Sequence, residues 1–380
     1  MPSEAQRGLR PTQEVQRAET AFGNTEKERG TAGKGAVGKL VWRIIALTLA
    51  IIISGLLIGQ YDTHVRDDNY LAAVLEKDRL IRNTASPKII LVGGSNLAFG
   101  IDSKEMMDSL GLNVVNMGLY AKLGLRYMLA QVKPYIKKGD IVIVVPEYDQ
   151  FYGDFANGDN TLNTALLYAP ADRIPDFIRS YSIVDVVLRP RVENARRSFL
   201  RAVAAAVGRE NQFFPPDTDP VYNRHSFNQY GDVVSHLGKK GLDPDSIYVK
   251  PLPPLKDFNR KTLSDLNSVS DKAAEVGARA YFMFPSYIDR SYVINVAAID
   301  SLRRKLAGGM KMPIIGTARD FVYPKQLFFD TRYHLTGEGR QLRTLEMIHI
   351  LRETGRKDGW ISRQLSAFGF QRSALSERHN

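Results

Sequence analysis

Three residue types that together make a serine nucleophile stand at two places in the chain. Ser95 follows Gly93 and Gly94 directly after an apolar run, and Asp330 and His334 lie close together near the C-terminal end. A histidine that accepts the hydroxyl proton makes a serine nucleophilic, and a carboxylate fixes the imidazole tautomer and stabilises its charged form. The sequence therefore predicts a catalytic set of Ser95, Asp330 and His334.

Acyl chemistry at a serine also needs hydrogen-bond donors for the oxyanion that develops. The backbone N–H groups of Ser95 and Gly118 are the candidate donors, and Glu147 and Tyr148 form a third candidate site after another apolar run. The sequence has no H-E-x-x-H motif and no cysteine, so we expect neither a metal nor a cofactor.

Short apolar runs must position these residues. Three of them are rich in β-branched residues and end within two residues of a glycine or a proline: Lys88–Val92, Asn113–Asn116 and Asp140–Val145. This pattern predicts buried parallel strands. Because ligand sites in open α/β sheets form at the carboxyl ends of the strands, we expect the turns after these three strands to meet at one site.

The strands alternate with helical patterns, which predicts an α/β fold whose parallel sheet is covered on both faces. Residues 150–259 interrupt this alternation with proline pairs and many aromatics, and we expect them to form an insertion that caps the strand ends. The other predicted elements are the helices Asp68–Arg82, Asp102–Leu110, Leu125–Lys138, Ile174–Leu188, Val192–Val207, Lys261–Val276, Val293–Leu306 and Leu342–Arg352, and the strands Ala280–Phe284 and Pro313–Gly316.

An uncharged apolar segment, residues 44–61, precedes the strands. It is just long enough to span a bilayer as a helix. Basic residues precede it and mostly acidic residues follow it, which predicts that the N-terminus is inside and the rest of the chain outside. One alternative is a cleaved signal peptide, which is disfavoured because the preceding region is long and no A-x-A site follows the segment. The other is a buried core helix.

The amino-acid composition excludes a disordered, a collagen-like or a polytopic membrane protein. Hydrophobic residues make up 44% and charged residues 24%, which is ordinary for a globular chain. The net charge is +11 without a dense block of Lys and Arg or zinc-finger spacing, so we expect no nucleic-acid partner. A run of arginines from Arg189 to Arg201 is either a solvated helix face or a site for an anionic glycan or lipid headgroups.

The blocks around the candidate residues resemble those of the SGNH/GDSL hydrolase superfamily. The segment LVGGSN with Ser95 is similar to the first block, Gly118 to the glycine of the second, and Asp330 and His334 to the last, in the same chain order. The resemblance covers roughly residues 88–150 and 260–350. It implies a three-layer, flavodoxin-like domain that acts as a serine esterase or O-acyltransferase through an acyl-Ser95 intermediate.

In overall layout the chain looks most like membrane-anchored, extracytoplasmic members of that superfamily, such as D-alanyl-lipoteichoic acid transfer proteins and alginate-type O-acetyltransferases. This likeness implies a cell-envelope or secreted polysaccharide as the substrate. It also implies a membrane acyltransferase or a polysaccharide export complex as a partner.

Two positions depart from the family pattern. Three residues instead of two separate Asp330 from His334, and Glu147 stands where the third block has an asparagine that donates to the oxyanion. A carboxylate there repels an oxyanion unless it is protonated or turned away, and losing one donor costs about 10²–10³ in rate. The alternative function is therefore a catalytically weak or inactive module that binds or guides a polysaccharide in an export complex.

The predicted organisation has four parts. Residues 1–38 form a disordered cytoplasmic tail, residues 40–61 a transmembrane helix, residues 62–354 the SGNH-like domain with its insertion at 150–259, and residues 355–380 a polar tail. We expect a single-pass protein of the bacterial cytoplasmic membrane whose C-terminal domain lies in the periplasm or outside the cell.

Overall fold

The computed structural model describes residues 37–50, 53–54, 68–214 and 219–361. The chain divides into two units, Met1–Ile58 and Gly59–Asn380. In the first unit, residues 37–50 and 53–54 are helical. Most of the predicted tail 1–38, residues 51–52 and 55–61 of the predicted membrane segment, and residues 362–380 lie outside the described residues. Within the described ranges, no helix has both the length and the apolar character needed to cross a membrane.

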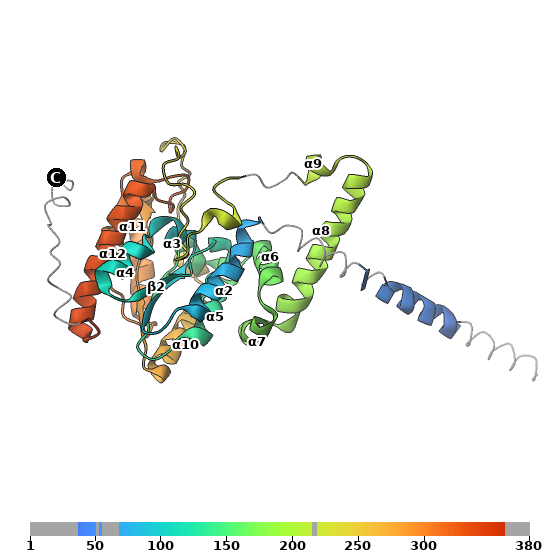
Figure 1. Cartoon of the computed structure of the whole chain (residues 1–380), viewed down its shortest axis with the longest axis horizontal. Helices are drawn as coiled ribbons and strands as arrows, with labels where there is room; N and C mark the ends of the chain where they lie inside the picture. Colours follow the sequence, from blue (N-terminus) through green and yellow to red (C-terminus); the bar gives the residue numbers. More distant parts are fainter. Residues whose placement is uncertain (1–36, 51–52, 55–67, 215–218, 362–380) are drawn as a thin grey trace, which may run out of the picture. The chain divides into compact units, whose positions relative to one another are not determined.

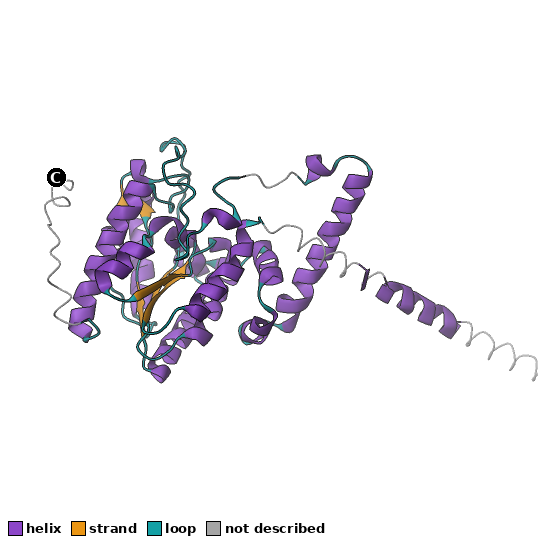
Figure 2. Ribbon diagram, in the orientation of Figure 1, coloured by secondary structure: helices purple, strands orange, loops and turns teal. Residues whose placement is uncertain are grey.

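A parallel sheet of four strands, in the order β2-β1-β3-β4, forms the centre of the second unit (Figure 2). Residues of β1 and β3 are buried throughout, as the continuous apolar runs predict. The register pairs Ile89 of β1 with Val114 of β2 and with Ile141 of β3. The strands are β1 (Lys88–Gly93), β2 (Asn113–Asn116), β3 (Ile141–Val145) and β4 (Arg279–Phe282).

The predicted strand Pro313–Gly316 is wrong, because only Ile314 pairs with the sheet, through a parallel bridge to Phe282 of β4. Phe282 donates its N–H to the Pro313 carbonyl and accepts the N–H of Ile315. Pro313 has no N–H of its own, and Gly316, with φ of 69°, turns the chain away after two residues. A separate two-stranded parallel pair, which the sequence did not predict, joins β5 (Tyr287–Ile288) to β6 (Val322–Tyr323).

Helices cover both faces of the sheet, with α5 and α10 on one side and α4 and α12 on the other (Figure 1). They are α2 (Val74–Asn83), α3 (Ser95–Gly100), α4 (Ser103–Leu110), α5 (Leu125–Val132), α6 (Asn160–Tyr168), α7 (Ile174–Ile178), α8 (Arg189–Ala206), α9 (Glu210–Phe213), α10 (Lys261–Val276), α11 (Asp289–Ala307) and α12 (Gly337–Asp358).

Several helix ends follow from local residues. Asp102 caps α4 by accepting the N–H of Glu105 at 3.2 Å. Helix α5 ends at Val132, short of the predicted end, where a 3-10 turn containing Pro134 begins. Helix α12 extends into the predicted polar tail as far as Asp358, where Gly359 in the left-handed conformation ends it.

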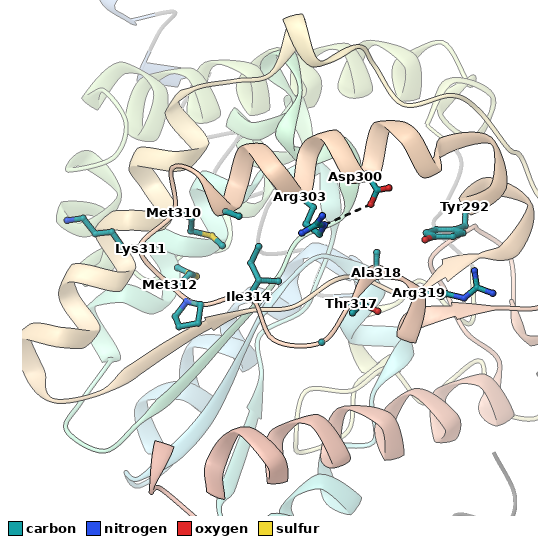
Figure 3. Close-up of a pocket in the computed structure, with 13 residues that line it drawn as sticks. Tyr292, Asp300, Arg303, Met310, Lys311, Met312, Ile314, Thr317, Ala318 and Arg319 are labelled. Atoms are coloured by element: carbon teal, nitrogen blue, oxygen red, sulfur yellow. Dashed lines mark ion pairs between the residues drawn. The ribbon is translucent and has the colours of Figure 1, made fainter. Parts of the chain in front are cut away.

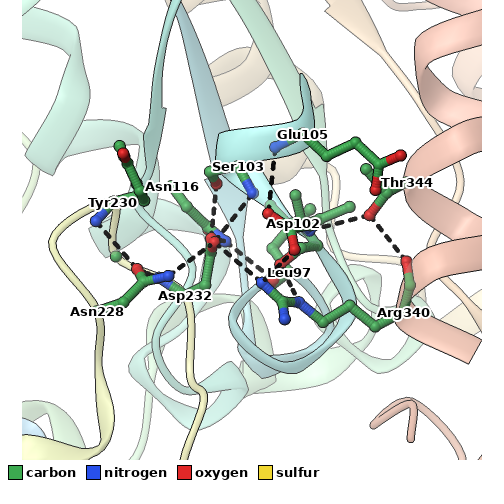
Figure 4. Close-up of polar contacts among 12 residues, drawn as sticks. Leu97, Asp102, Ser103, Glu105, Asn116, Asn228, Tyr230, Asp232, Arg340 and Thr344 are labelled. Atoms are coloured by element: carbon green, nitrogen blue, oxygen red, sulfur yellow. Dashed lines mark hydrogen bonds and ion pairs between the residues drawn. The ribbon is translucent and has the colours of Figure 1, made fainter. Parts of the chain in front are cut away.

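The buried carboxylate of Asp232 connects the second half of the insertion to the sheet (Figure 4). Asp232 accepts hydrogen bonds from the N–H and the hydroxyl of Ser103 at 2.9 and 2.6 Å, and from Asn116 Nδ2 at 2.9 Å. Arg340 of α12 supplies a cation 3.4 Å away. Because a buried charge is costly without partners, this network holds the segment around Asp232 against the end of β2.

Candidate active site

Ser95 is the first residue of α3 and follows β1 after the two glycines. The absence of a side chain at Gly94 is a steric requirement, because a Cβ there would lie 2.7 Å from Glu147 Oε1. Glu147 follows β3, the strand next to β1 in the sheet. The glycine pair therefore lets the turn that carries Ser95 approach the turn that carries Glu147, as expected for the carboxyl ends of adjacent parallel strands.

The Ser95 hydroxyl donates a hydrogen bond to Glu147 Oε1 over 3.3 Å. The same oxygen accepts the backbone N–H of Asn96 at 3.1 Å. Gln150 holds the turn in place, since its side-chain oxygen accepts the Glu147 N–H at 3.0 Å. Burial raises the pKa of Glu147, while the charge of His334 and the hydrogen bond from Asn96 act in the opposite direction.

Asp330 and His334 form the second half of the site. His334 Nδ1 lies 2.7 Å from Asp330 Oδ1, so the extra residue between them does not prevent their contact. The Thr331 hydroxyl accepts the N–H groups of Tyr333 and His334, which closes the loop into a compact turn. The imidazole is buried and stacks on Phe99 of α3, with ring centroids 4.2 Å apart and planes 6° from parallel.

Tyr222 of the insertion completes this pair. Its hydroxyl donates to Asp330 Oδ2 and lies 3.0 Å from His334 Nδ1. Burial raises the pKa of Asp330, but the hydrogen bond and charge of His334 and the hydrogen bond from Tyr222 outweigh it, so the pKa lies below its usual value. Asp330 is therefore held ionised beside the imidazole.

Ser95, Glu147, Asp330 and His334 line one cavity of about 330 Å³. No hydrogen bond joins Ser95 to His334 among the described residues, because the hydroxyl is directed to Glu147. The pocket also carries aromatic and charged side chains at its rim and floor. These are Tyr120, Lys122, Asp149, Phe155, Tyr248, Lys250, Arg332 and Tyr333.

The structure does not bring two of the predicted residues into this cavity. Gly118 donates its N–H to Asn116 Oδ1 at 2.9 Å, so this donor is already used. A Cβ at Gly118 would lie 2.7 Å from the Ala98 nitrogen, which shows that this glycine is needed for packing against α3. The Tyr148 ring is buried beside Tyr287, and its hydroxyl has no partner among the described residues.

Sequence reasoning missed a second group of charges in the pocket. Asp149 is bound by Arg332 at 2.5 Å, Lys250 at 3.0 Å and the Tyr333 hydroxyl at 3.2 Å. Burial opposes ionisation, but the charge of Arg332 and the contact with Lys250 hold the pKa of Asp149 below its usual value. Asp149 directly follows the two third-block candidates, and that position after β3 was the one signal available in the sequence.

A larger hollow of about 520 Å³ lies between α11 and residues 310–319 (Figure 3). Asp300 and Arg303 form an ion pair of 3.9 Å at its edge, and it contains none of the predicted site residues. We therefore assign the chemistry to the smaller cavity. Within the described ranges, no three His, Asp or Glu side chains are grouped to hold a metal ion, and the expected lack of a metal stays a prediction.

No protein-family model matches the chain, and no curated protein matches it either.

Proposed function

We propose that this chain is an SGNH-type serine ester hydrolase or O-acyltransferase. The observation that carries the proposal is the Asp330–His334 contact in the same cavity as the Ser95 hydroxyl. A buried imidazole that is oriented by an ionised carboxylate is the base that a serine nucleophile needs. The location of this cavity at the carboxyl edge of a parallel sheet supports the same reading.

The sheet supports the family resemblance in a second way. The strand order 2-1-3-4, with the bridge at Ile314 beyond β4, is the order of flavodoxin-like sheets, whose ligand site lies where β1 and β3 diverge. Ser95 follows β1 and Glu147 follows β3. A three-layer, flavodoxin-like SGNH domain is therefore part of the proposal.

The proposed reaction has two steps. Because His334 Nδ1 contacts Asp330, Nε2 is left to accept the Ser95 proton once the hydroxyl rotates away from Glu147. Ser95 Oγ then attacks the acyl carbon, and the tetrahedral intermediate expels the donor's alcohol, which takes the proton from His334. In the second step water or a sugar hydroxyl loses its proton to His334 and attacks the acyl-Ser95 ester. The bond between the acyl carbon and Ser95 Oγ then breaks, and Oγ takes the proton back from His334. Water gives an esterase and a sugar hydroxyl gives a transferase.

Glu147 has a role in this scheme if it is neutral. Oε1 accepts the Ser95 and Asn96 donors, so a proton on Oε2 would make the side chain a donor. A carboxylic acid that is kept neutral by burial can stabilise an oxyanion. Protonated Glu147 would then replace the asparagine of the family's third block, and the raised pKa supports this assignment.

The remaining parts of the proposal concern location and substrate. The uncharged segment 44–61 and its flanking charges support a membrane anchor with the catalytic domain on the periplasmic or outer side. Tyr120, Phe155 and Tyr248 at the cavity suit the faces of sugar rings. We propose a cell-envelope or secreted polysaccharide as the substrate, and a membrane acyltransferase or a polysaccharide export complex as the partner.

A specific observation favours a second candidate function. The Ser95 hydroxyl is bonded to Glu147 and not to His334. If Glu147 were ionised, it would hold the serine away from the base and repel an oxyanion. The chain would then be a non-catalytic module that binds or guides a polysaccharide.

Hydrolysis of p-nitrophenyl acetate by the full chain in detergent distinguishes the two candidates. We expect slow hydrolysis, which S95A, H334A and the double variant reduce by similar factors because the residues act as a unit. A serine-directed phosphonate should label the wild type at Ser95 and leave S95A unlabelled. The matched control is S301A on α11, which should retain activity and labelling.

An unlabelled and inactive wild type would favour the non-catalytic module. Full activity in S95A would mean that the nucleophile is assigned wrongly.

A further inference from the structure

Helix α8 carries an apolar stripe that faces away from the rest of its unit. Phe199 is 63% exposed, Val192 and Val203 are also exposed, and exposed Leu188 directly precedes the helix. Their spacing places them on one side of the helix, because residues three, four and seven apart share a face. The stripe continues at both ends with exposed Val184 and Val207.

The opposite side of α8 is the one that packs. Pro190, Ser198 and Ala204 are buried on that side. Figure 1 shows α8 beside α6. The stripe therefore takes no part in packing α8 against the domain, and no described residue covers it. An exposed apolar surface of this length marks an interaction site.

Exposed arginines flank the stripe. Arg196 is 65% exposed and Arg189 is 60% exposed. Among the residues that the structure describes, the ion pair of each is with a carboxylate of the same helical stretch, Glu193 or Asp185. Such surface ion pairs contribute little and are easily exchanged for another anion. An apolar stripe bordered by arginines is the pattern of a helix that lies in the interface of a membrane.

We propose that α8 is a membrane-interface helix that seats the catalytic domain on an anionic bilayer, with the stripe at the acyl boundary and the arginines at lipid phosphates. The inference rests on the membrane location within the proposed function. Segment 44–61 ends nine residues before Tyr70, a reach of about 30 Å when fully extended. A domain on so short a tether remains close to the bilayer, where a helix about 27 Å long can lie on the surface.

The chemistry of the stripe favours lipid over a glycan. Sugar recognition needs polar groups and aromatic faces, whereas five of the six stripe residues are aliphatic: Val184, Leu188, Val192, Val203 and Val207, with Phe199 the exception. Charge complementarity between the arginines and anionic headgroups supplies the second attraction. A protein partner or a second copy of the chain on this face is an alternative outcome of the test.

The test uses a fluorescent probe at one introduced cysteine, since the chain has none of its own. Full-length F199C, labelled with an environment-sensitive dye, is reconstituted in vesicles of phosphatidylglycerol and phosphatidylcholine that contain lipids with a quencher near the acyl carbonyl. The matched control is V293C on α11, because Val293 is 72% exposed. We expect lipid quenching of the F199C probe and iodide quenching of the V293C probe.

A second set of variants tests the arginines. R189Q and R196Q combined in F199C should weaken the surface affinity for anionic vesicles by roughly fivefold per arginine at low salt, and should reduce the lipid quenching accordingly. The two substitutions should change little in pure phosphatidylcholine. High salt should have the same effect as the substitutions.

Three outcomes overturn the inference. They are an F199C probe that only iodide quenches, equal lipid quenching of both probes, and a probe shielded from lipid and iodide together, which would indicate a protein partner or a second copy. If the chain does not enter vesicles at all, the proposed membrane location fails first. A chain that enters vesicles with Phe199 in water defeats the interface helix alone.

Discussion

Oε1 of Glu147 lies 3.3 Å from the Ser95 hydroxyl oxygen and 3.1 Å from the Asn96 nitrogen, so one carboxyl oxygen accepts from both residues at the start of α3. A proton on the other oxygen, Oε2, would make the side chain neutral. In the proposed reaction, the protonation state of Glu147 therefore decides whether this contact assists the attack by Ser95 or blocks it. Burial favours the protonated form by raising the pKa of Glu147.

The pH dependence of ester hydrolysis tests that role. We expect the wild-type rate to fall as pH rises through the raised pKa of Glu147, because the carboxylate repels the developing oxyanion. E147Q cannot ionise, yet its amide still accepts through Oε1 and donates through nitrogen. It should remain within about tenfold of the wild type at its optimum, since a neutral donor is kept, and should lose the decline at high pH.

The comparison requires pH–rate profiles of both proteins between pH 5 and about 9. An E147Q protein without activity at any pH, while the wild type is active, would show that the carboxylate itself is required.

The same group makes a prediction for stability. A carboxyl whose pKa is higher in the folded than in the unfolded state binds more protons when folded, so its contribution to stability declines as pH rises from the unfolded value through the raised one. E147Q removes this decline. The free energy of unfolding of E147Q, relative to that of the wild type, should therefore increase as pH rises from 4 to about 8. Urea unfolding at several pH values measures this difference. The assignment is contradicted if the free energy of unfolding of E147Q falls relative to that of the wild type as pH rises.

Local sequence patterns predicted most of the sheet. Strand β2 has its predicted bounds, Asn113–Asn116, and β1 and β3 differ from theirs by one residue. Helix α10 has its predicted bounds, Lys261–Val276, because its apolar spacing is regular and Gly277 ends it. The pattern wrongly predicted a strand at Pro313–Gly316. There the chain pairs with the sheet through Ile314 alone, because Pro313 lacks an N–H and Gly316 turns the chain away.

Asp330 and Asp149, two of the three carboxylates that line the pocket, should behave differently when neutralised. D330N should reduce the rate by about 10³–10⁴, because the 2.7 Å contact with His334 fixes the imidazole. D149N replaces the carboxylate that pairs with buried Arg332 by a neutral amide. The buried guanidinium then lacks a counter-charge, which should cost about 3–5 kcal/mol of stability. Kinetics and denaturant unfolding of both variants separate the effects. The assignment is wrong if D330N is the unstable variant and D149N the stable but inactive one.

The candidate site was only partly predictable. Ser95, Asp330 and His334 were found from residue type and chain order, and they line one cavity. The sequence could not show that Asn116 occupies the Gly118 donor, because that contact depends on how the side chain after β2 turns. Nor could it select Tyr222 among the aromatics of the insertion, since the contact joins residues 108 positions apart.

Gly118 remains sensitive to substitution for a steric reason. A Cβ at this position would lie 2.7 Å from the Ala98 nitrogen and 2.8 Å from the Gly94 carbonyl oxygen, both of which are backbone atoms. G118A should therefore displace the start of α3 and cost about 1–3 kcal/mol of stability. Thermal unfolding measures the loss, with G308A as the control, because Gly308 has a φ of −83° and a Cβ there would come no closer than 3.4 Å to another atom. A G118A protein as stable as the wild type would contradict this packing.

Tyr222 tests whether the insertion belongs to the site. Y222F keeps the ring against Phe99 and removes only the hydroxyl that donates to Asp330 and lies 3.0 Å from His334 Nδ1. Asp330 then has one donor fewer to hold its orientation, so we expect kcat to fall roughly tenfold, a loss of about 1.4 kcal/mol, with little change in KM.

Y248F is the matched control for Tyr222, because Tyr248 lines the same cavity but is 74% exposed. Its hydroxyl makes no hydrogen bond to the Asp330–His334 pair among the described residues, so Y248F should leave kcat unchanged. Steady-state kinetics with an activated ester supply both constants. If Y222F raised KM and left kcat intact, the tyrosine would be a substrate contact. If it altered neither constant, the short contact with Asp330 would have no part in orienting His334, and the insertion would serve only to cover the pocket.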